Sequence, residues 1–92
     1  MTMKRLSVIF SGMVQGVGFR FACERTARRF SLAGYVRNLP SGKVELVAEG
    51  EETVLKDFLK GVCESSMQSY IRDVETHWSG AEGNFKQFSI RA

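Results

Sequence analysis

The sequence predicts an α+β fold in which two helices cover one face of an antiparallel sheet. In several segments apolar residues alternate with polar ones, which is the period of a strand with one buried face. In two other segments apolar residues recur every three or four positions, as in an amphipathic helix. The order of these segments is βαββαβ followed by one short strand, and this order is typical of a two-layer sandwich.

A chain of 92 residues has room for one hydrophobic core, so we expect a single domain over residues 1–92. The 43% apolar content is that of an ordinary globular protein, and the net charge of +3 is small and dispersed, so it does not indicate a nucleic-acid partner. No apolar run approaches the roughly 18 residues of a membrane span, and no signal-peptide core follows Met1. We therefore expect a cytoplasmic protein with no membrane partner.

The first strand is predicted over residues 6–11, where apolar and polar residues alternate until Gly12. Farther along, apolar residues spaced by three and four positions predict an amphipathic helix from Phe19 to about Ser31. The residues that carry the two patterns are Leu6, Val8 and Phe10 in the strand and Phe19, Cys23, Ala27 and Phe30 in the helix.

Two further strands are predicted over residues 35–38 and 43–48. They are joined by Leu39-Pro40-Ser41-Gly42, where proline second and glycine fourth suit a type I turn, so we expect a hairpin. Acidic residues between Glu49 and Thr53 suit the positive end of a helix dipole, so the second helix is predicted to open there and to end at residues 64–66. Its buried stripe is Val54, Leu55, Phe58, Leu59 and Val62.

The last strands are predicted over residues 70–78 and 85–91, with an exposed connection over residues 79–84. The whole pattern predicts a ferredoxin-like βαββαβ sandwich with an extra short C-terminal strand. His77 lies late in the first of these strands, where we expect a surface position. Cys23 and Cys63 match no metal-ligand spacing; two buried free thiols are favoured over a disulfide, which the sequence leaves open. We expect no metal site and no cofactor.

The segment with most chemical information is Gly12-Met13-Val14-Gln15-Gly16-Val17-Gly18, which we call the glycine loop. It lies between a predicted strand and a predicted helix, where consecutive backbone N–H groups and the helix dipole together favour an anion. Glycine adopts positive φ without a Cβ clash, so the backbone can approach a ligand closely. Because the loop has almost no side-chain chemistry, we expect its main-chain donors to bind the anion.

Arg20 lies in the first turn of the predicted helix. A basic residue is disfavoured there because it is repelled by the helix dipole, and an anion between the two would remove the conflict. The planar guanidinium also binds two phosphate oxygens at once, which lysine cannot do. On these residues alone, a tight turn with Arg20 in solvent explains the pattern equally well. The glycine spacing and the missing Lys-Ser/Thr pair exclude a Walker loop and a dinucleotide fingerprint.

Two segments carry a resemblance to a known family. Residues 12–20, GMVQGVGFR, and residues 34–50, which begin GYVRNLPSGKV, resemble the two signatures of the acylphosphatase family at the family's usual separation. Phe10 stands where that family usually has a branched aliphatic residue, a departure expected to affect core packing and not the site. The resemblance implies that Arg20 and Asn38 are the catalytic pair. It implies that the phosphoryl group is bound by the main-chain amides of Val14, Gln15, Gly16, Val17, Gly18 and Phe19.

The activity implied by this resemblance is metal-independent hydrolysis of the carboxyl–phosphate anhydride of small acyl phosphates, by a free-standing monomer. Asn38 suits the orientation of a water molecule, because an amide both donates and accepts without titrating. Without the resemblance, a strand-end asparagine that caps the hairpin is the favoured explanation.

Two alternative functions stay open at this point. The first is an accessory acyl- or carbamoyl-phosphate-binding domain, like the similar domain at the N-terminus of a carbamoyl-transferring hydrogenase-maturation protein. The second is an RNA-binding module of the same fold class, which is disfavoured because the strand over residues 43–48 has no aromatic residue. Arg25, Arg28 and Arg29 form a helix stripe that suits a solvated face better than a docking surface.

Overall fold

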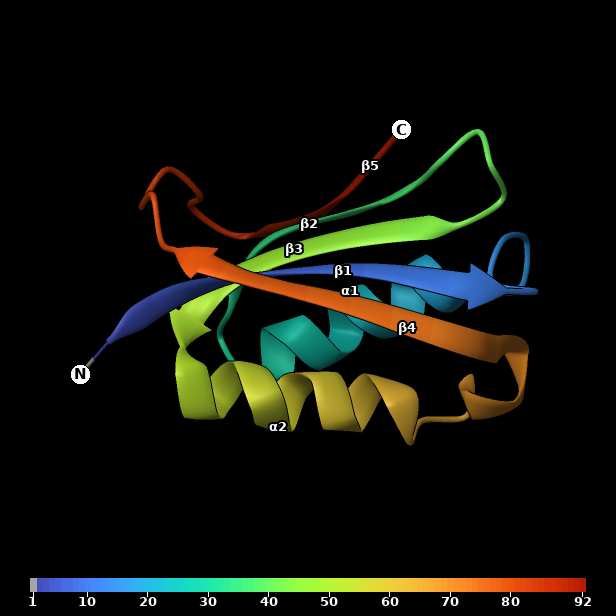
Figure 1. Cartoon of the computed structure of the whole chain (residues 1–92), viewed down its shortest axis with the longest axis horizontal. Helices are drawn as coiled ribbons and strands as arrows, with labels where there is room; N and C mark the ends of the chain where they lie inside the picture. The colour runs from blue at the N-terminus through green and yellow to red at the C-terminus, as the bar shows by residue number, and fades with distance from the viewer. Residues whose placement is uncertain (1) are drawn as a thin grey trace.

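The computed structural model describes residues 2–92, so Met1 of the expected domain lies outside the described residues. The elements follow one another in the predicted order (Figure 1). They are β1 (Met3–Gly12), α1 (Phe19–Arg29), β2 (Ala33–Asn38), β3 (Val44–Glu51), α2 (Glu52–Cys63), the 3₁₀ turn η1 (Gln68–Tyr70), β4 (Ile71–Gly80) and β5 (Phe88–Arg91).

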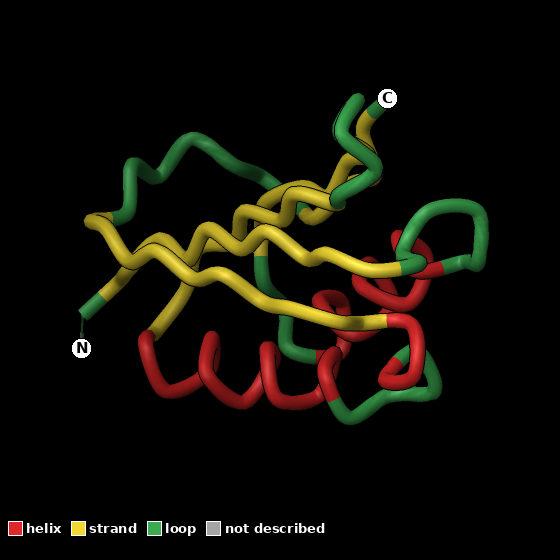
Figure 2. Tube along the Cα trace, turned by 45° about the vertical axis from the view of Figure 1, so that its right-hand side comes forward, coloured by secondary structure: helices red, strands yellow, loops and turns green. Residues whose placement is uncertain are grey.

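The strands form one sheet in the order β4-β1-β3-β2-β5, and α1 and α2 cover the same face of it (Figures 1 and 2). The ferredoxin-like fold class is confirmed. One detail differs, because β5 lies parallel to β2 and makes the sheet mixed rather than purely antiparallel. The connection between β4 and β5 stays at one end of the sheet, so β5 runs back against the direction of β4 and therefore along that of β2.

The hydrophobic core lies between the sheet and the two helices. Phe19, Cys23 and Ala27 of α1 are buried against the sheet, as the helical spacing predicts. On α2 the predicted stripe is confirmed, with Leu55, Phe58 and Val62 buried and Val54 and Leu59 packed at its margin. The sheet residues of this core are Leu6, Val8, Phe10, Val36, Val44, Leu46, Ala48 and Phe88.

The start of α2 was predicted wrongly, because residues 49–51 extend β3. Glu49 faces Arg5 across the β1–β3 ladder, and Arg5 Nε donates to its carboxylate at 2.8 Å. Gly50 is covered so closely by Leu32 that a Cβ at position 50 would lie 2.4 Å from its Cδ2 atom. Gly50 and Glu51 continue the same ladder opposite Lys4 and Met3, so the chain stays extended as far as Glu51 and α2 begins at Glu52.

Several other boundaries also differ by a few residues; for example, β1 begins at Met3 and β2 at Ala33, earlier than predicted. α1 ends at Arg29, and Ser31 beyond it adopts a left-handed φ of 55°. β4 covers Ile71–Gly80 because Tyr70 belongs to η1. β5 begins at Phe88 rather than at Phe85, whose ring instead packs edge-on against Tyr35 with centroids 5.9 Å apart. The β2–β3 turn is confirmed, since Gly42 N–H donates to Leu39 O at 3.1 Å.

The connection over residues 81–87 contacts the sheet face that the helices leave open. The Glu49 carboxylate accepts hydrogen bonds from the backbone N–H groups of Glu82 at 2.8 Å and Gly83 at 3.0 Å, besides the one from Arg5. We call Arg5, Glu49, Glu82 and Gly83 the Glu49 cluster. Burial alone would raise the pKa of Glu49, but these hydrogen bonds outweigh burial and lower its pKa below the ordinary value.

Candidate active site

The glycine loop is attached to the sheet at Gly12, the last residue of β1. Gly12 has a φ of +127°, and a Cβ there would lie 2.3 Å from the carbonyl oxygen of Tyr70. The next residue, Met13, donates its N–H to that same oxygen at 2.9 Å. A residue with a side chain at position 12 would therefore separate the loop from the beginning of β4, so glycine is required here by close approach.

Beyond Met13 the loop leaves its backbone donors free. Between Val14 and Phe21, no backbone N–H donates to any of residues 2–92, and the next one to do so is Ala22, to Gly18 O at 3.1 Å. Gly18 precedes α1 with a left-handed φ of 82°, and no side chain caps the helix. The unpaired N–H groups of the loop thus continue directly into those of the helix N-terminus, which carries partial positive charge.

A cavity of about 250 Å³ lies at these donors. Gly16 and Gly18 have φ values of +76° and +82°, and a Cβ built on either would meet nothing within 4 Å. Glycine is needed at both positions for the backbone conformation, not for packing, and the space beside them is open. The cavity is lined by Val14, Gly16, Gly18, Phe19, Arg20 and Phe21.

The side chains of Val14 and Phe19 lie in the core, each only 1% exposed. Phe19 packs edge-on against Phe10 with ring centroids 4.8 Å apart. Phe10 is therefore a core residue, as expected, but it also supports a residue that lines the cavity. Because the Val14 and Phe19 side chains are buried, these residues offer an anion mainly their backbone.

Arg20 lies in the first turn of α1 and lines the cavity. No ion pair joins it to an acidic residue within residues 2–92, and the first turn of α1 contains no acidic residue. The guanidinium and the N–H groups of the helix start therefore repel each other without any internal compensation. An anion in the cavity would remove this repulsion.

Asn38 is the last residue of β2 and lies on the face of the sheet that the helices cover. Its partner across the ladder is Val44, whose partner in turn is Phe10, and both are fully buried on that face. Paired residues point to the same side of a sheet, so Asn38 points toward the layer in which α1 begins. Its Oδ1 atom is buried and has no hydrogen-bond partner in residues 2–92. Asn38 lies outside the six residues that line the cavity.

Gln15 connects the glycine loop to the hairpin that follows Asn38. Its Nε2 atom donates to Leu39 O at 2.8 Å and to Lys43 O at 2.9 Å. In Figure 1 the loop and the β2–β3 connection lie at the same end of the sheet. Of the predicted phosphate-binding residues, Val14, Gly16, Gly18 and Phe19 line one cavity with Arg20, whereas Gln15 and Val17 do not. The Gln15 side chain ties the loop to the strand end that carries Asn38.

Two features of the site were missed from the sequence. One is the pair of hydrogen bonds from the Gln15 side chain to the carbonyls of Leu39 and Lys43. The other is Phe21, which lines the cavity while 65% exposed. Sequence periodicity gives no reason to single out Phe21, because an exposed position on the polar side of a helix is assigned to solvent.

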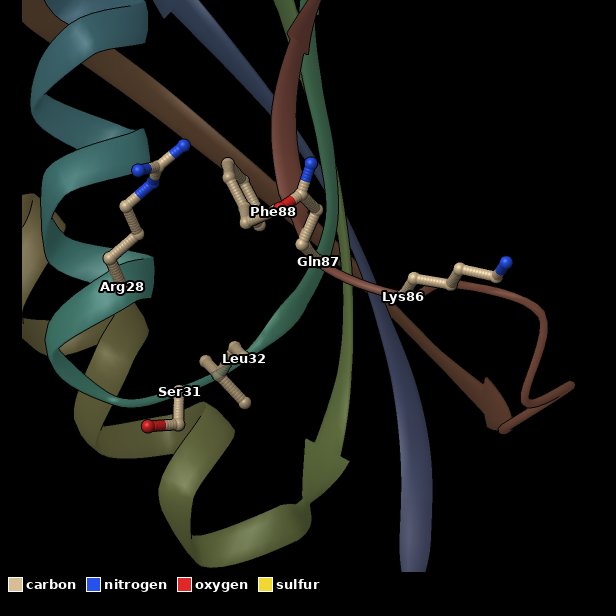
Figure 3. A pocket seen from close by; sticks show the side chains of 6 residues that line it. All are labelled: Arg28, Ser31, Leu32, Lys86, Gln87 and Phe88. Atoms are coloured by element: carbon tan, nitrogen blue, oxygen red, sulfur yellow. The ribbon is translucent and has the colours of Figure 1, made fainter.

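A second cavity of about 260 Å³ lies at the other end of α1, lined by Arg28, Ser31, Leu32, Lys86, Gln87 and Phe88 (Figure 3). Lys86 extends away from the other lining side chains (Figure 3). Arg28 pairs with Glu24 along the helix at 3.4 Å, so its charge is already partnered. This cavity therefore lacks the convergent, unpaired donors of the first one.

The remaining candidate groups lie outside the cavity. Cys23 and Cys63 are free, the first buried and the second half-buried, and burial raises the pKa of Cys23 to about 12. His77 is exposed on β4, as expected. Residues 2–92 contain no group of three His, Cys, Asp or Glu side chains that could hold a metal ion. Within the same residues, no helix has the length and apolar character to cross a membrane.

Free backbone N–H groups and an arginine lie at the start of a helix on a ferredoxin-like sandwich, so the molecule is a small α+β protein with a loop whose donors suit an anion. The family model described as Acylphosphatase matches residues 6–90. This chain belongs to the acylphosphatase family.

Known proteins are similar to this chain in sequence and structure over nearly its whole length. An acylphosphatase of Salinibacter ruber is 40% identical over 90 residues, which cover 98% of this chain and 95% of that protein. The crystal structure of acylphosphatase from Bacillus subtilis has a TM-score of 0.89 at 36% identity and covers 97% of this chain and 99% of that one. Full-length HypF in a phosphate- and nucleotide-bound form has a TM-score of 0.84 at 25% identity, over 99% of this chain and 12% of that chain.

Proposed function

We propose that this enzyme hydrolyses small acyl phosphates to a carboxylate and inorganic phosphate at the cavity beside Arg20. The observation that carries the proposal concerns residues 2–92: the backbone N–H groups from Val14 to Phe21 are unpaired there, and Arg20 beside them has no acidic partner. Such an arrangement favours a dianionic phosphoryl group over any neutral ligand. Membership of the acylphosphatase family supplies the reaction.

In the proposed mechanism, Arg20 and the amides of residues 14–19 bind the phosphoryl oxygens. Asn38 orients a water molecule in line with phosphorus, and its buried, unpartnered Oδ1 suits an acceptor for a water O–H. The water oxygen bonds to phosphorus while the phosphorus–oxygen bond to the acyl group breaks, and the carboxylate leaves with the electron pair. The proton of the water passes to a phosphoryl oxygen of the substrate, so no protein base is required.

This reaction asks mainly for positioning and charge stabilisation, because a carboxylate is a good leaving group. We therefore propose that activity is independent of metal ions and cofactors, with Arg20 supplying the positive charge. We further propose a monomer without a nucleic-acid partner. A cytoplasmic location is supported by the two free thiols, since oxidising compartments favour disulfides.

The test is hydrolysis of benzoyl phosphate in EDTA, with inorganic phosphate as competitor. We expect turnover that EDTA leaves unchanged and that phosphate inhibits competitively. Loss of activity in EDTA that a divalent ion restores would contradict the metal-free mechanism. Absence of turnover under all these conditions would contradict the proposed function itself.

The second candidate is an accessory domain that binds an acyl or carbamoyl phosphate without hydrolysing it. It is favoured by the similarity to a segment of the larger HypF chain, whose structure is described as phosphate-bound. The same assay separates the two functions. An accessory domain binds phosphate but shows no turnover above the uncatalysed rate, whereas the proposed enzyme shows both.

A further inference from the structure

The side chain of Gln15 makes the contact that joins the two halves of the proposed site. Its Nε2 donates to Leu39 O and Lys43 O, at 2.8 and 2.9 Å. These two carbonyls also close the hairpin, since Leu39 N–H donates to Lys43 O and Gly42 N–H to Leu39 O. Gln15 therefore bridges the two ends of the turn that begins one residue after Asn38.

The same contacts limit what the Gln15 side chain can do for substrate. A primary amide has two N–H donors, and the two hairpin carbonyls use both. Only Oε1 remains, and an acceptor does not favour a phosphoryl oxygen. The side chain of Gln15 is thus committed to the protein, and only its backbone N–H is free for the phosphoryl group.

We propose that Gln15 is a positioning residue, which holds the hairpin against the glycine loop so that Asn38 faces the phosphoryl group. This inference rests on the proposed function. Asn38 is the last residue of β2 and Arg20 lies in the first turn of α1; the Gln15 bridge joins the loop that precedes Arg20 to the turn that follows Asn38. Without it, the loop amides and Arg20 still bind phosphate, but the water is no longer aligned.

A double-mutant cycle tests this role, with Gln15→Ala, Asn38→Ala and the pair compared with the unmodified enzyme. Gln15→Ala should lower kcat about tenfold while the inhibition constant for inorganic phosphate stays within about twofold. Adding Gln15→Ala to the Asn38→Ala enzyme should change kcat little, because the residue acts through Asn38. Multiplicative effects, or an equal change in phosphate inhibition, would overturn the proposal; an unmodified enzyme without turnover would instead refute the proposed function.

Gln15→Glu separates positioning from packing, because the side chain keeps its size and loses its N–H donors. At neutral pH the carboxylate would face two carbonyl oxygens, so kcat should fall further than in Gln15→Ala. Toward acid the protonated carboxyl regains one O–H donor, and kcat relative to the unmodified enzyme should rise. A flat ratio across pH would contradict the role. Gln87→Ala, an exposed glutamine at the far end of α1, is the matched control, and circular dichroism checks folding.

An independent observation concerns the acyl group. Phe21 lines the cavity and is 65% exposed, whereas the other apolar lining side chains, Val14 and Phe19, are buried in the core. It follows Arg20 directly on α1, so its ring borders the place where the phosphoryl group is proposed to bind. The ring is therefore the apolar surface that a bound acyl phosphate can reach.

We infer that Phe21 contacts the acyl group and makes the enzyme favour aromatic over small acyl phosphates; this too rests on the proposed function. Phe21→Ala should lower kcat/KM for benzoyl phosphate roughly five- to tenfold and leave that for acetyl phosphate within about twofold. Met13→Ala is the matched control, since Met13 is 75% exposed but outside the cavity. Equal losses for both substrates, no loss for either, or the same discrimination in Met13→Ala would overturn the inference.

Discussion

Each end of the sheet has an arginine beside consecutive backbone N–H groups, but these donors bind a carboxylate of the protein's described residues at only one of the two ends. At one end, the Glu49 carboxylate accepts from Arg5 and from two consecutive backbone N–H groups of a glycine-containing connection, at 2.8 to 3.0 Å. At the other end, the glycine loop offers Arg20 and consecutive backbone N–H groups, and no carboxylate within residues 2–92 pairs with Arg20 or accepts from those N–H groups. Figure 1 shows the two loops at opposite ends of the molecule.

We propose that the two ends use these donors differently, one to stabilise the fold and the other to bind a ligand. In the Glu49 cluster the protein supplies its own anion, so the donors stabilise the fold and are closed to ligands. In the glycine loop no acidic side chain of residues 2–92 occupies the donors, so they can bind an anionic ligand. If the two ends differ in this way, substitutions in the glycine loop's site should affect activity and substitutions in the Glu49 cluster should affect stability.

The largest effect is expected at Arg20. Arg20→Lys keeps the charge but loses the planar pair of donors, so turnover should fall at least about a hundredfold and phosphate inhibition should weaken. The free energy of unfolding should change little, because Arg20 has no ion-pair partner to lose within residues 2–92. Steady-state kinetics with benzoyl phosphate and a denaturant titration measure the two quantities. Turnover like that of the unmodified enzyme would contradict the role of Arg20.

The second largest loss of activity is expected when Asn38 is substituted. Asn38→Ala should lower kcat roughly ten- to a hundredfold, because the water loses its orientation, while competition by inorganic phosphate stays nearly intact. The measurement is kcat together with the phosphate inhibition constant. If the substitution abolishes phosphate binding instead, Asn38 belongs to the binding part of the site and the water-orienting role is wrong.

Substitution in the Glu49 cluster should have the opposite effect to substitution in the glycine loop's site: stability should fall while activity is kept. Glu49→Gln removes the carboxylate that the three donors share, so the free energy of unfolding should fall by roughly 1–3 kcal/mol while kcat at saturating substrate stays near that of the unmodified enzyme. Urea denaturation and benzoyl-phosphate turnover measure the two effects. A large loss of kcat with unchanged stability would show that this end of the sheet also acts in catalysis.

The same cluster predicts a dependence on pH. Because its folded-state pKa is lowered, Glu49 stabilises the fold fully above its unfolded value of about 4.3, and this contribution is lost as the pH falls through the lower, folded value. Urea denaturation should therefore show stability decreasing in acid less steeply for Glu49→Gln than for the unmodified chain. Identical slopes would mean that other carboxylates account for the acid sensitivity.

The smallest effect is that of a ligand on stability. Inorganic phosphate at ten times its dissociation constant should raise the free energy of unfolding by about 1.4 kcal/mol, since it binds only the folded chain. Thermal melts with phosphate and with equal ionic strength of chloride measure this. At the same phosphate concentration the gain should be smaller in Arg20→Lys and unchanged in Glu49→Gln; a gain that depends on Glu49 would reverse the comparison.

The fold was predictable wherever apolar side chains recur with the spacing of a helix or the alternation of a strand. The α1 helix begins at Phe19 as its apolar spacing predicts, and the strands of β1 and β3 follow their alternation. The start of α2 was predicted wrongly because the acidic residues from Glu49 to Glu52 suit a helix N-terminus, whereas Glu49 is held in β3 by Arg5, which lies far away in the sequence. A long-range ion pair of this kind leaves no local pattern.

The site was predictable in part. The glycine loop and Arg20 are neighbours along the chain, so the sequence alone contains the local conflict of charge that indicates an anion. Asn38 came from the family resemblance, because its relation to the loop depends on the sheet register. The Gln15 bridge depends on two backbone carbonyls of the hairpin. Because every residue has a backbone carbonyl, residue types do not indicate which ones accept a hydrogen bond.

The most direct test of the difference between the two ends is a ¹H–¹⁵N NMR titration with inorganic phosphate. The amide resonances between Val14 and Phe21 should shift and saturate together, while those of Glu82 and Gly83 stay in place because Glu49 already occupies their donors. Loop resonances that do not respond, or shifts of similar size at Glu82 and Gly83, would contradict the claim that the glycine loop is the open anion site.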